Sequence, residues 1–584
     1  MVIFEKFLIF LSMHRRTFLE LLSVPAALSP LGFPTFASPR TLPFRSDFYA
    51  ADIVIAGGGL GGCAAALAAL RHGRRVVMTE ETDWIGGQMT QQGVPPDEHP
   101  WIETHGATQA YRDLRTAIRQ YYFDHYPVTT AARQQPYFNP GDGAVSRLCH
   151  EPQVALAVLY DLFAPYLSNR QLTLLLHHRI AGADVEGDHV RTLTATDLRT
   201  GAAVELSAPY FVDATELGDL LPLTGTEYVT GTESQKQTGE LHAPERADPT
   251  NQQAFTMCLA MDYVPGTEAS AAGMPATENL IDKPRDYDFW RNFVPDLAPD
   301  WPGRLLSLTY THPSTLQPKT LGFDPRGGAT GEVLNLWNYR RMISEKNFRP
   351  GTYVGDVTGV NWPQNDYFLG NLVDVSPEEA QRHVEQSKQL SLSLFYWLQT
   401  EAPRPDGGQG WPGLRLRGDV LGTDDGLAKY PYVRESRRIK ALFTILEEHV
   451  GKEQRALVAG HGATAARFYD SVGVGYYHID LHPSSGGDNY IDFASLPFQI
   501  PLGALLPQRM QNLLPANKNI GTTHITNGCY RLHPVEWSIG EAIGLLTTFA
   551  MDRKTTPHAV REDASLLADF QQWIRKQGIE TQWK

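Results

Sequence analysis

Histidine and carboxylate residues alternate in one short segment, at a spacing that suits proton transfer. His478, Asp480 and His482 are separated by single apolar residues. On a strand, side chains two residues apart point to the same side, so the three polar groups would share one face. Because imidazole titrates near neutral pH, His482 or His478 is predicted to remove a proton from a substrate. The same spacing could ligate a metal or form only a hydrogen-bonded polar face, and we expect no bound metal.

Three arginines in another short segment could bind a negatively charged group. Arg434, Arg437 and Arg438 have the spacing i, i+3, i+4, which places them on one face if the segment is helical. Guanidinium groups match carboxylates in shape and charge. We therefore predict that Arg437 anchors the substrate. An internal network of ion pairs is the alternative interpretation.

These side chains need a scaffold, and the clearest one begins near residue 52. Residues 52–56 form a short apolar run typical of a buried parallel strand, and residues 63–70 are small residues that favour a closely packed helix. The glycine-rich sequence 57–62 separates them, and a second strand is predicted over residues 74–78. The order of strand, glycine loop, helix and strand predicts a dinucleotide-binding fold.

The glycine loop indicates where a dinucleotide would lie. Gly57 permits the tight turn, Gly59 lets the backbone approach a pyrophosphate, and Gly62 lets the helix pack against the sheet. The free N–H groups at the helix start favour phosphate. Glu80 would accept the ribose hydroxyls, with Glu81 as the alternative. The predicted contacts in this region are Gly57, Gly59, Leu60, Gly61, Gly62, Glu80 and Glu81.

A second glycine pair bears on the choice between NAD and FAD. Gly86 lies six residues after Glu80 and is followed by Gly87, Gln88 and Met89. NAD does not need a glycine loop at this place. The segment resembles the loop that runs beside the second phosphate and the ribityl chain in flavoproteins. A simple glycine turn is the alternative.

Later segments add further parts of the same fold. Four strands are predicted over residues 172–180, 190–197, 202–206 and 210–215. Near the C-terminus, residues 512–522 lead towards a helix that begins near Pro534, and proline is favoured at a helix start. Gly540 and Gly544 lie four residues apart on one face of that helix, which permits close packing.

With these motifs, the chain resembles the FAD-dependent oxidoreductase family, whose members have a glutathione-reductase-like FAD-binding fold. Four further stretches resemble predicted secreted members of the family: residues 139–149, 213–220, 432–439 and 531–537. The resemblance covers about residues 50–550. It implies an α/β fold with a parallel Rossmann sheet and an inserted mixed α+β substrate or cap domain.

The resemblance also implies how FAD would lie along the chain. The glycine loop and Glu80 would hold the ADP half, and the backbone of Ile180 would face the adenine. The helix after Pro534 would direct its N-terminus at the isoalloxazine ring, where it would stabilise the reduced flavin. The other implied contacts are Gly87, Gln88, Met89, Asp213, Ala214, Thr215, Asn519 and Ile520. Residues that flank this end of the cofactor are His524, Arg531 and His533, and His524 is a further candidate catalytic residue.

Two absences from the sequence bear on the reaction. No second glycine fingerprint follows a strand, so we expect no separate NAD(P)H domain, and no redox cysteine pair is present. The predicted function is oxidation of a polar small molecule (an alcohol, sugar or amine) by hydride transfer to flavin N5, with electrons passed to oxygen or another acceptor. The alternatives are a monooxygenase or halogenase supplied with reduced flavin, and a non-catalytic FAD-bound binding protein.

The predicted domain organisation places the substrate-binding part inside the FAD-binding fold. The FAD-binding domain is predicted to consist of two parts, residues 50–225 and 496–555, with a substrate or cap domain over 226–495 between them. Residues 556–584 are predicted to form a helical tail. Within the insertion, residues 361–367 set aromatic rings beside amides. That mixture suits a sugar or another polar ring, and it equally suits a turn held by Asn side chains.

Composition and the N-terminal sequence bear on partners and location. The 584-residue chain has a net charge of −14, which argues against nucleic acid as a partner because phosphate binding needs clustered Lys and Arg. The 4 cysteines are too few for a disulfide framework. Residues 1–37, with Arg15 and Arg16 before an apolar run and with Met13 as the expected start, resemble a twin-arginine export signal. We expect a periplasmic or extracellular protein without a stable membrane span, the alternative being an uncleaved anchor or a chance Arg-Arg pair.

Overall fold

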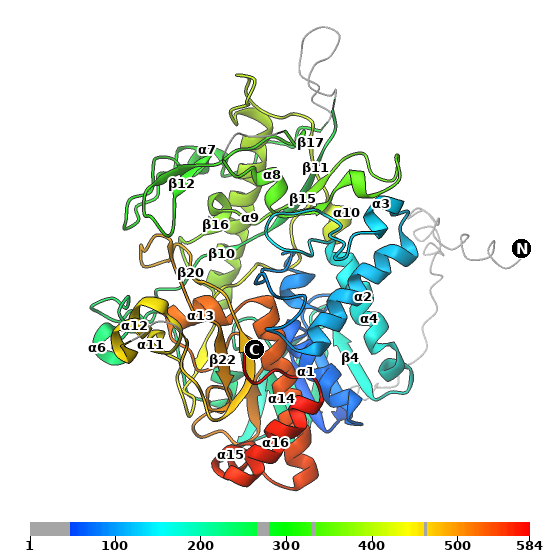
Figure 1. Ribbon diagram of the computed structural model, residues 1–584, viewed down its shortest axis with the longest axis vertical. Coiled ribbons are helices and arrows are strands. Elements are labelled where there is room, and N and C mark those ends of the chain that lie inside the picture. The colour runs from blue at the N-terminus through cyan, green and yellow to red at the C-terminus, as the bar shows by residue number, and fades with distance from the viewer. Residues whose placement is uncertain (1–46, 266–278, 329–332, 461–463, 584) are drawn as a thin grey trace, which may run out of the picture. The chain divides into compact units, whose positions relative to one another are not determined.

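A parallel sheet of five strands carries the predicted dinucleotide fingerprint. The computed structural model describes residues 47–265, 279–328, 333–460 and 464–583 (Figure 1). The predicted export signal therefore lies outside the described residues. The strand order is β23 (Leu513–Pro515), β8 (Tyr210–Asp213), β2 (Ile53–Ala56), β3 (Val76–Glu80) and β4 (Leu172–Leu176), all parallel. Every residue of β2 and β3 is buried, as the apolar runs predict.

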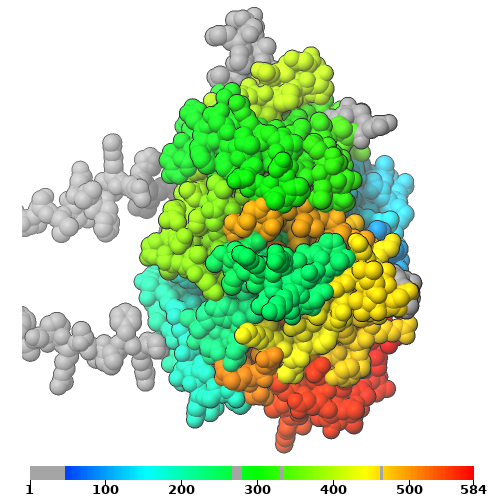
Figure 2. Space-filling view, turned by 90° about the vertical axis from the view of Figure 1, so that its left-hand side faces the viewer, coloured from blue at the N-terminus to red at the C-terminus, as the bar shows by residue number. Residues whose placement is uncertain are grey.

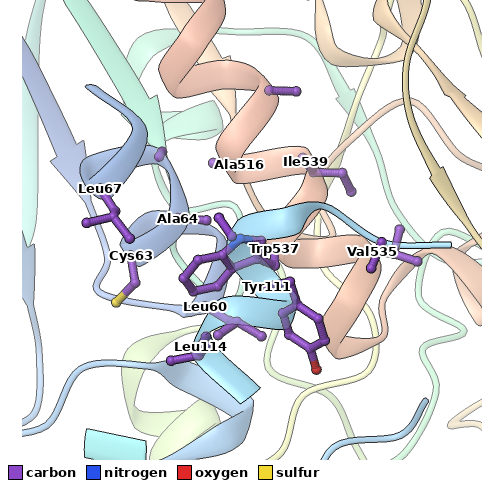
Figure 3. Packing of buried hydrophobic residues seen from close by; sticks show 14 of the residues in the cluster. Leu60, Cys63, Ala64, Leu67, Tyr111, Leu114, Ala516, Val535, Trp537 and Ile539 are labelled. Atoms are coloured by element: carbon purple, nitrogen blue, oxygen red, sulfur yellow. The ribbon is translucent and has the colours of Figure 1, made fainter. Parts of the chain in front are cut away.

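Two helices pack against each other beside this sheet. Helix α1 (Leu60–Arg71) follows the glycine loop, and α14 (His533–Arg553) is the predicted C-terminal helix. A Cβ atom built on Gly540 would lie 1.9 Å from the carbonyl oxygen of Gly61, so the two backbones touch. Figure 3 shows Trp537 of α14 among Leu60 of α1 and Tyr111 of α2 (Gln109–His125). The glycine spacing on α14 is thereby explained by close helix packing.

A second sheet lies next to the first and corrects one predicted strand. It has the order β1 (Asp47–Ala50), β7 (Ala203–Ser207), β6 (His189–Asp197) and β5 (His178–Glu186). The sequence predicted a single strand over residues 172–180. The chain turns instead at His177, whose φ of 58° is left-handed, so β4 joins the first sheet and β5 the second. Ile180 consequently lies on the second sheet.

The inserted segment forms its own antiparallel sheet and a long helix. The sheet has the order β14 (Arg341–Ile343), β15 (Val357–Val360), β11 (Leu259–Tyr263) and β17 (Leu414–Leu416). Helix α9 (Pro377–Thr400) begins at Ser376, whose side chain accepts a hydrogen bond from the N–H of Glu379 and caps it. Strands β20 (Ile479–Leu481) and β21 (Ile491–Phe493) form a separate pair. Figure 2 shows this part of the chain, in orange, against earlier residues of the insertion, in green.

Shorter elements complete the described chain. The helices are α3 (Thr130–Arg133), α4 (Pro152–Ser168), α5 (Leu220–Thr224), α6 (Gln235–Thr238), α7 (Tyr287–Asn292), α8 (Leu336–Tyr339), α10 (Gly418–Leu421), α11 (Glu447–Val450), α12 (Lys452–Ala459), α13 (His524–Tyr530), α15 (Pro557–Glu562) and α16 (Ala564–Lys576). The strands are β9 (Tyr228–Val229), β10 (Phe255–Thr256), β12 (Thr309–Thr311), β13 (Pro318–Thr320), β16 (Asp366–Tyr367), β18 (Arg438–Ile439), β19 (Ser471–Gly475) and β22 (Phe498–Pro501). Among the described residues, no helix combines the length and apolar character that a membrane span requires.

Candidate active site

A small cavity lies at the carboxyl ends of β2, β3 and β8, where ligands bind in open α/β sheets. It collects many of the predicted nucleotide contacts: Gly57, Gly59, Glu80, Glu81, Ile180, Ala214 and Thr215. Two residues that the sequence did not single out, Arg179 and Tyr430, also line it. Gly57 turns here with a φ of 92°, and a Cβ atom on it would collide with the carbonyl group of Ala214. Glycine is therefore required at this turn.

The two predicted ribose-binding carboxylates both face this cavity. The Oε2 atom of Glu80 accepts a hydrogen bond from the N–H of Gly58 at 2.9 Å, and its Oε1 accepts one from the N–H of Thr82 at 2.9 Å. Burial raises the pKa of Glu80 to about 7, although these bonds oppose the shift. Burial likewise raises the pKa of Glu81 to about 8. The structure therefore keeps both carboxylates as candidates for the ribose hydroxyls.

Buried charged and polar groups continue from this cavity towards the start of α14. Lys518 Nζ lies 2.5 Å from Glu216 Oε2 and 3.7 Å from Glu536 Oε1. Gln88 donates to Glu536 and, at 2.8 Å, to the carbonyl oxygen of Arg531. Four buried oxygen atoms along this path have no hydrogen-bond partner in the described chain: Gln88 Oε1, Glu216 Oε1, Asn517 Oδ1 and Glu536 Oε1. Such groups are costly to leave unpaired, so the path suits a long polar ligand.

A second cavity, of about 360 Å³, is lined by the β20–β21 pair and by residues between 310 and 363 of the insertion, among others. Its lining includes His478, Asp480 and His482, so the structure brings these three residues together as their alternation predicts. The predicted polar segment 361–367 contributes Asn361 and Trp362 to the same lining. The remaining charged and aromatic lining residues are Asp97, Tyr310, His312, Tyr339, Arg340, Tyr432, Arg434, Tyr477, Tyr490, Asp492 and Arg531.

His482 is held between two carboxylates in this cavity. Its Nδ1 lies 2.7 Å from Asp366 Oδ2, and its Nε2 lies 3.3 Å from Asp480 Oδ2. Asp366 is fully buried and pairs with Arg434 at 2.9 Å. Burial alone would raise the pKa of Asp366, but the charges of Arg434 and His482 bring it to about 2. Asp366 therefore stays ionised and orients the imidazole.

The cavity meets the polar path at its inner end. Arg531 lines the cavity and donates to Asp480 Oδ2 at 3.2 Å, while its carbonyl oxygen accepts the hydrogen bond from Gln88. Asp97, which also lines the cavity, donates its N–H to His533 Nδ1 at 3.2 Å, at the first residue of α14. The second glycine segment and the start of α14 thus border the cavity that holds His482.

A comparison with protein families shows which family the chain belongs to. The family model described as "FAD dependent oxidoreductase" matches residues 52–573. The chain belongs to this family. It is an FAD-dependent oxidoreductase, and its α/β fold places the glycine loop after the central strand of a parallel sheet.

Comparisons with individual proteins add the following findings. Among curated proteins, none matches the sequence. Solved structures with a likeness include L-proline dehydrogenase from P. horikoshii, at 16% identity and a TM-score of 0.17, covering 32% of this chain and 24% of that one. A variant of E. coli quinol fumarate reductase FrdA has 12% identity and a TM-score of 0.30, covering 91% of this chain and 74% of that one. The chain thus spans about a quarter of the length of the first of these proteins. At these scores the likenesses carry no argument about substrate.

The residues along the path fit FAD. The glycine cradle allows the close approach of a diphosphate. The carboxylates at the end of β3 and the unpartnered buried oxygen atoms can accept hydrogen bonds from the hydroxyl and N–H groups of the cofactor. Some predicted contacts are buried but do not line the nucleotide cavity: Leu60, Gly61, Gly62, Gly87, Gln88, Met89, Asp213, Asn519 and Ile520. Asp213, for example, accepts from the N–H groups of Thr215 and Leu220, at 3.1 Å each, and so fixes the turn after β8.

The predicted arginine face does not exist, because the segment is extended. Backbone hydrogen bonds join Tyr432 to Thr256, and β18 pairs with β9, so the segment has strand-like partners instead of a helical turn. Arg434 reaches the cavity, but Arg437 pairs with Asp374 at 2.8 Å and with Asp219 at 3.2 Å and does not line it. The structure therefore places Arg437 in an ion-pair network, which was the alternative interpretation.

His524 also lies outside the cavity lining. Its Nδ1 is 2.9 Å from Glu435 Oε2, and its backbone N–H donates a hydrogen bond to Glu233 Oε2 at 2.9 Å.

The sequence analysis did not single out three residues of this site: Asp97, Arg340 and Asp366. Asp366 could have been found, since it lies within the polar segment 361–367 that the sequence singled out. In the described ranges, no cluster of three or more His, Cys, Asp or Glu side chains is arranged to hold a metal ion.

Proposed function

We propose that this FAD-dependent oxidoreductase oxidises a polar small molecule, an alcohol, a sugar or an amine, in the cavity that His482 lines. FAD, when bound, supplies the hydride acceptor at N5 and passes the electrons to oxygen or another acceptor. The observation that carries the proposal is the position of His482. It stands between Asp366 and Asp480 in a cavity whose inner residue Arg531 contacts the second glycine segment.

The proposed role of His482 is to accept the proton that leaves the substrate. Asp366 accepts a hydrogen bond from Nδ1 of His482. In the neutral imidazole the ring hydrogen therefore stays on Nδ1, and Nε2 is left as the proton acceptor. When Nε2 takes up the proton, Asp480 at 3.3 Å can accept a hydrogen bond from it. The imidazolium is then hydrogen-bonded at both nitrogens. His478, which is more exposed and pairs with Asp492 at 3.1 Å, remains the second candidate base.

Anaerobic reduction of the flavin tests this proposal. The purified holoenzyme is mixed with alcohols, sugars and amines, and the flavin absorbance is followed by stopped flow. We expect one compound class to bleach the flavin and His482→Gln to slow bleaching at least about a hundredfold, as loss of a general base does. His189→Gln, an exposed residue of β6, is the matched control. Reduction only by NAD(P)H would favour a monooxygenase, and reduction only by dithionite would favour a non-catalytic protein.

We also propose that the enzyme is exported. The support is the sequence of residues 1–37, with its arginine pair before an apolar run. The expected result is recovery of the native protein outside the cytoplasm, and its retention when Arg15→Lys and Arg16→Lys are combined. Equal distribution of both forms between the fractions would contradict the proposal.

A further inference from the structure

The charges of the cavity around His482 cancel pair by pair. Each of its three arginines meets a carboxylate: Arg340 with Asp97 at 3.2 Å, Arg434 with Asp366 at 2.9 Å, and Arg531 with Asp480 at 3.2 Å. At the mouth, His478 pairs with Asp492 at 3.1 Å. Among the three arginine–carboxylate pairs, a carboxylate or phosphate on a substrate would find no uncompensated cation, and an ammonium group would find no uncompensated carboxylate. Binding either one would require an existing pair to break, which is unfavourable in a buried site.

The remaining lining is aromatic and rich in hydrogen-bonding groups. Six aromatic side chains line the cavity: Tyr310, Tyr339, Trp362, Tyr432, Tyr477 and Tyr490. Rings of this kind combine an apolar body with a polar tip, so they can pack against C–H groups while hydroxyls reach polar partners. Four buried N–H groups of the lining have no acceptor in the described chain: Arg340 Nε, Arg434 Nε, Arg531 Nε and Trp362 Nε1. A ligand with several oxygen acceptors would satisfy such donors.

We propose that the substrate is a neutral, polyhydroxylated ring of the carbohydrate class. This inference rests on the proposed function, because it uses the same cavity and narrows the substrate class. Hydroxyl groups both donate and accept, so they can bind to paired carboxylates and guanidinium groups without separating them. The cavity volume of about 360 Å³ is at the small end of the range of about 300–1,000 Å³ for small-molecule sites. This size suits one or two sugar rings.

Equilibrium binding to the holoenzyme tests the inference without relying on turnover. Dissociation constants are measured anaerobically by calorimetry for methyl glucoside and methyl galactoside, for the matching glucuronate and galacturonate, and for glucosamine and galactosamine. We expect at least one neutral glycoside to bind at least tenfold more tightly than its charged counterparts. A tighter uronate or amino sugar would overturn the inference, as would the absence of binding by all neutral glycosides.

The test separates this inference from the proposed function. If a neutral glycoside binds but does not bleach the flavin, the proposed oxidation fails and the substrate class remains. If an aliphatic amine or alcohol bleaches the flavin while no sugar binds, the substrate class fails and the oxidation remains.

A charge substitution gives a second, independent readout. Asp97 pairs with Arg340 and is buried, so Asp97→Asn leaves one uncompensated guanidinium in the cavity. We expect the ratio of uronate to glycoside affinity to rise at least tenfold in this variant. Asp470→Asn, which breaks the pair with Arg561 at 2.7 Å outside the cavity, is the matched control and should leave the ratio unchanged. An unchanged ratio in a folded, FAD-loaded Asp97→Asn variant would refute the charge argument.

Discussion

The contact between α1 and α14 can be tested by adding a single methyl group. A Cβ atom on Gly540 would lie 1.9 Å from the carbonyl oxygen and 2.6 Å from the carbonyl carbon of Gly61. Cβ atoms essentially never approach other heavy atoms within 3.0 Å, so Gly540→Ala must push the two helices about 1.1 Å or more apart. Both partners are backbone atoms, so no side-chain rotation can relieve the clash.

The expected loss of stability follows from two opposing effects. Replacing a glycine by alanine inside a helix is by itself favourable by about 1 kcal/mol. Overpacking a close contact costs about 1–3 kcal/mol, and more where the neighbours cannot move. We therefore expect Gly540→Ala to destabilise the protein by about 2 kcal/mol. Because α1 begins directly after the glycine loop, we also expect the purified variant to contain less FAD.

Thermal unfolding and the ratio of flavin to protein absorbance measure both effects. Gly182→Ala is the control, since its Cβ would meet only Thr194, at 3.9 Å. A Cβ on Gly544 would lie 2.3 Å from the carbonyl oxygen of Ala65, so Gly544→Ala should also destabilise the protein. The double variant should lose less stability than the sum of the losses in the two single variants, because one separation of the helices relieves both clashes. A Gly540→Ala protein as stable and as yellow as the wild type would refute this reasoning.

Three further outcomes are expected. Asp366→Asn should lower kcat at least about tenfold, because His482 loses the carboxylate that orients its ring. An unchanged kcat in a folded, FAD-loaded variant would contradict this positioning role. Burial raises the pKa of Glu80 from 4.5 to about 7, so the unfolded chain loses this proton at a lower pH than the folded chain, and the apoprotein loses stability as the pH rises between these values. The melting temperature of Glu80→Gln should therefore fall less over this pH range than that of the wild type, and an equal fall would contradict the raised pKa. Glu216 Oε1 lies 3.1 Å from the Cβ position on Gly59, where the FAD diphosphate is expected, so its negative charge should repel the cofactor. Glu216→Gln should tighten FAD binding by the apoprotein at least about tenfold in a fluorescence titration, and unchanged or weaker binding would contradict this expectation.

Local patterns predicted the nucleotide-binding half well. The glycine loop, the flanking strands and the C-terminal helix were recognisable because each depends on residues that are close in sequence. Gly57, for example, is required by a turn whose geometry is fixed within a few residues. The split of the strand over residues 172–180 was not predicted, because both halves have strand-forming residues and only the left-handed turn at His177 separates them.

The substrate side was predicted less completely. His478, Asp480 and His482 were found from their alternation, but their partners come from distant segments. Asp366 lies in the insertion, and Arg531 lies just before α14. The spacing of Arg434, Arg437 and Arg438 suggested a helix, although the segment is extended. The spacing of three arginines does not reveal which strands the segment pairs with, and these backbone pairings hold it extended.

By itself, the sequence determined the dinucleotide-binding fold, because a glycine loop between two apolar strands has few structural alternatives. Its further motifs, through their resemblance to one family, indicated FAD as the cofactor. The tertiary structure decided which polar residues form the active site. That choice depends on side chains brought together across hundreds of residues, such as His482 with Asp366 and Asp97 with Arg340. The energy of a buried charge is set by the partner that reaches it, and this partner is fixed only when the chain has folded.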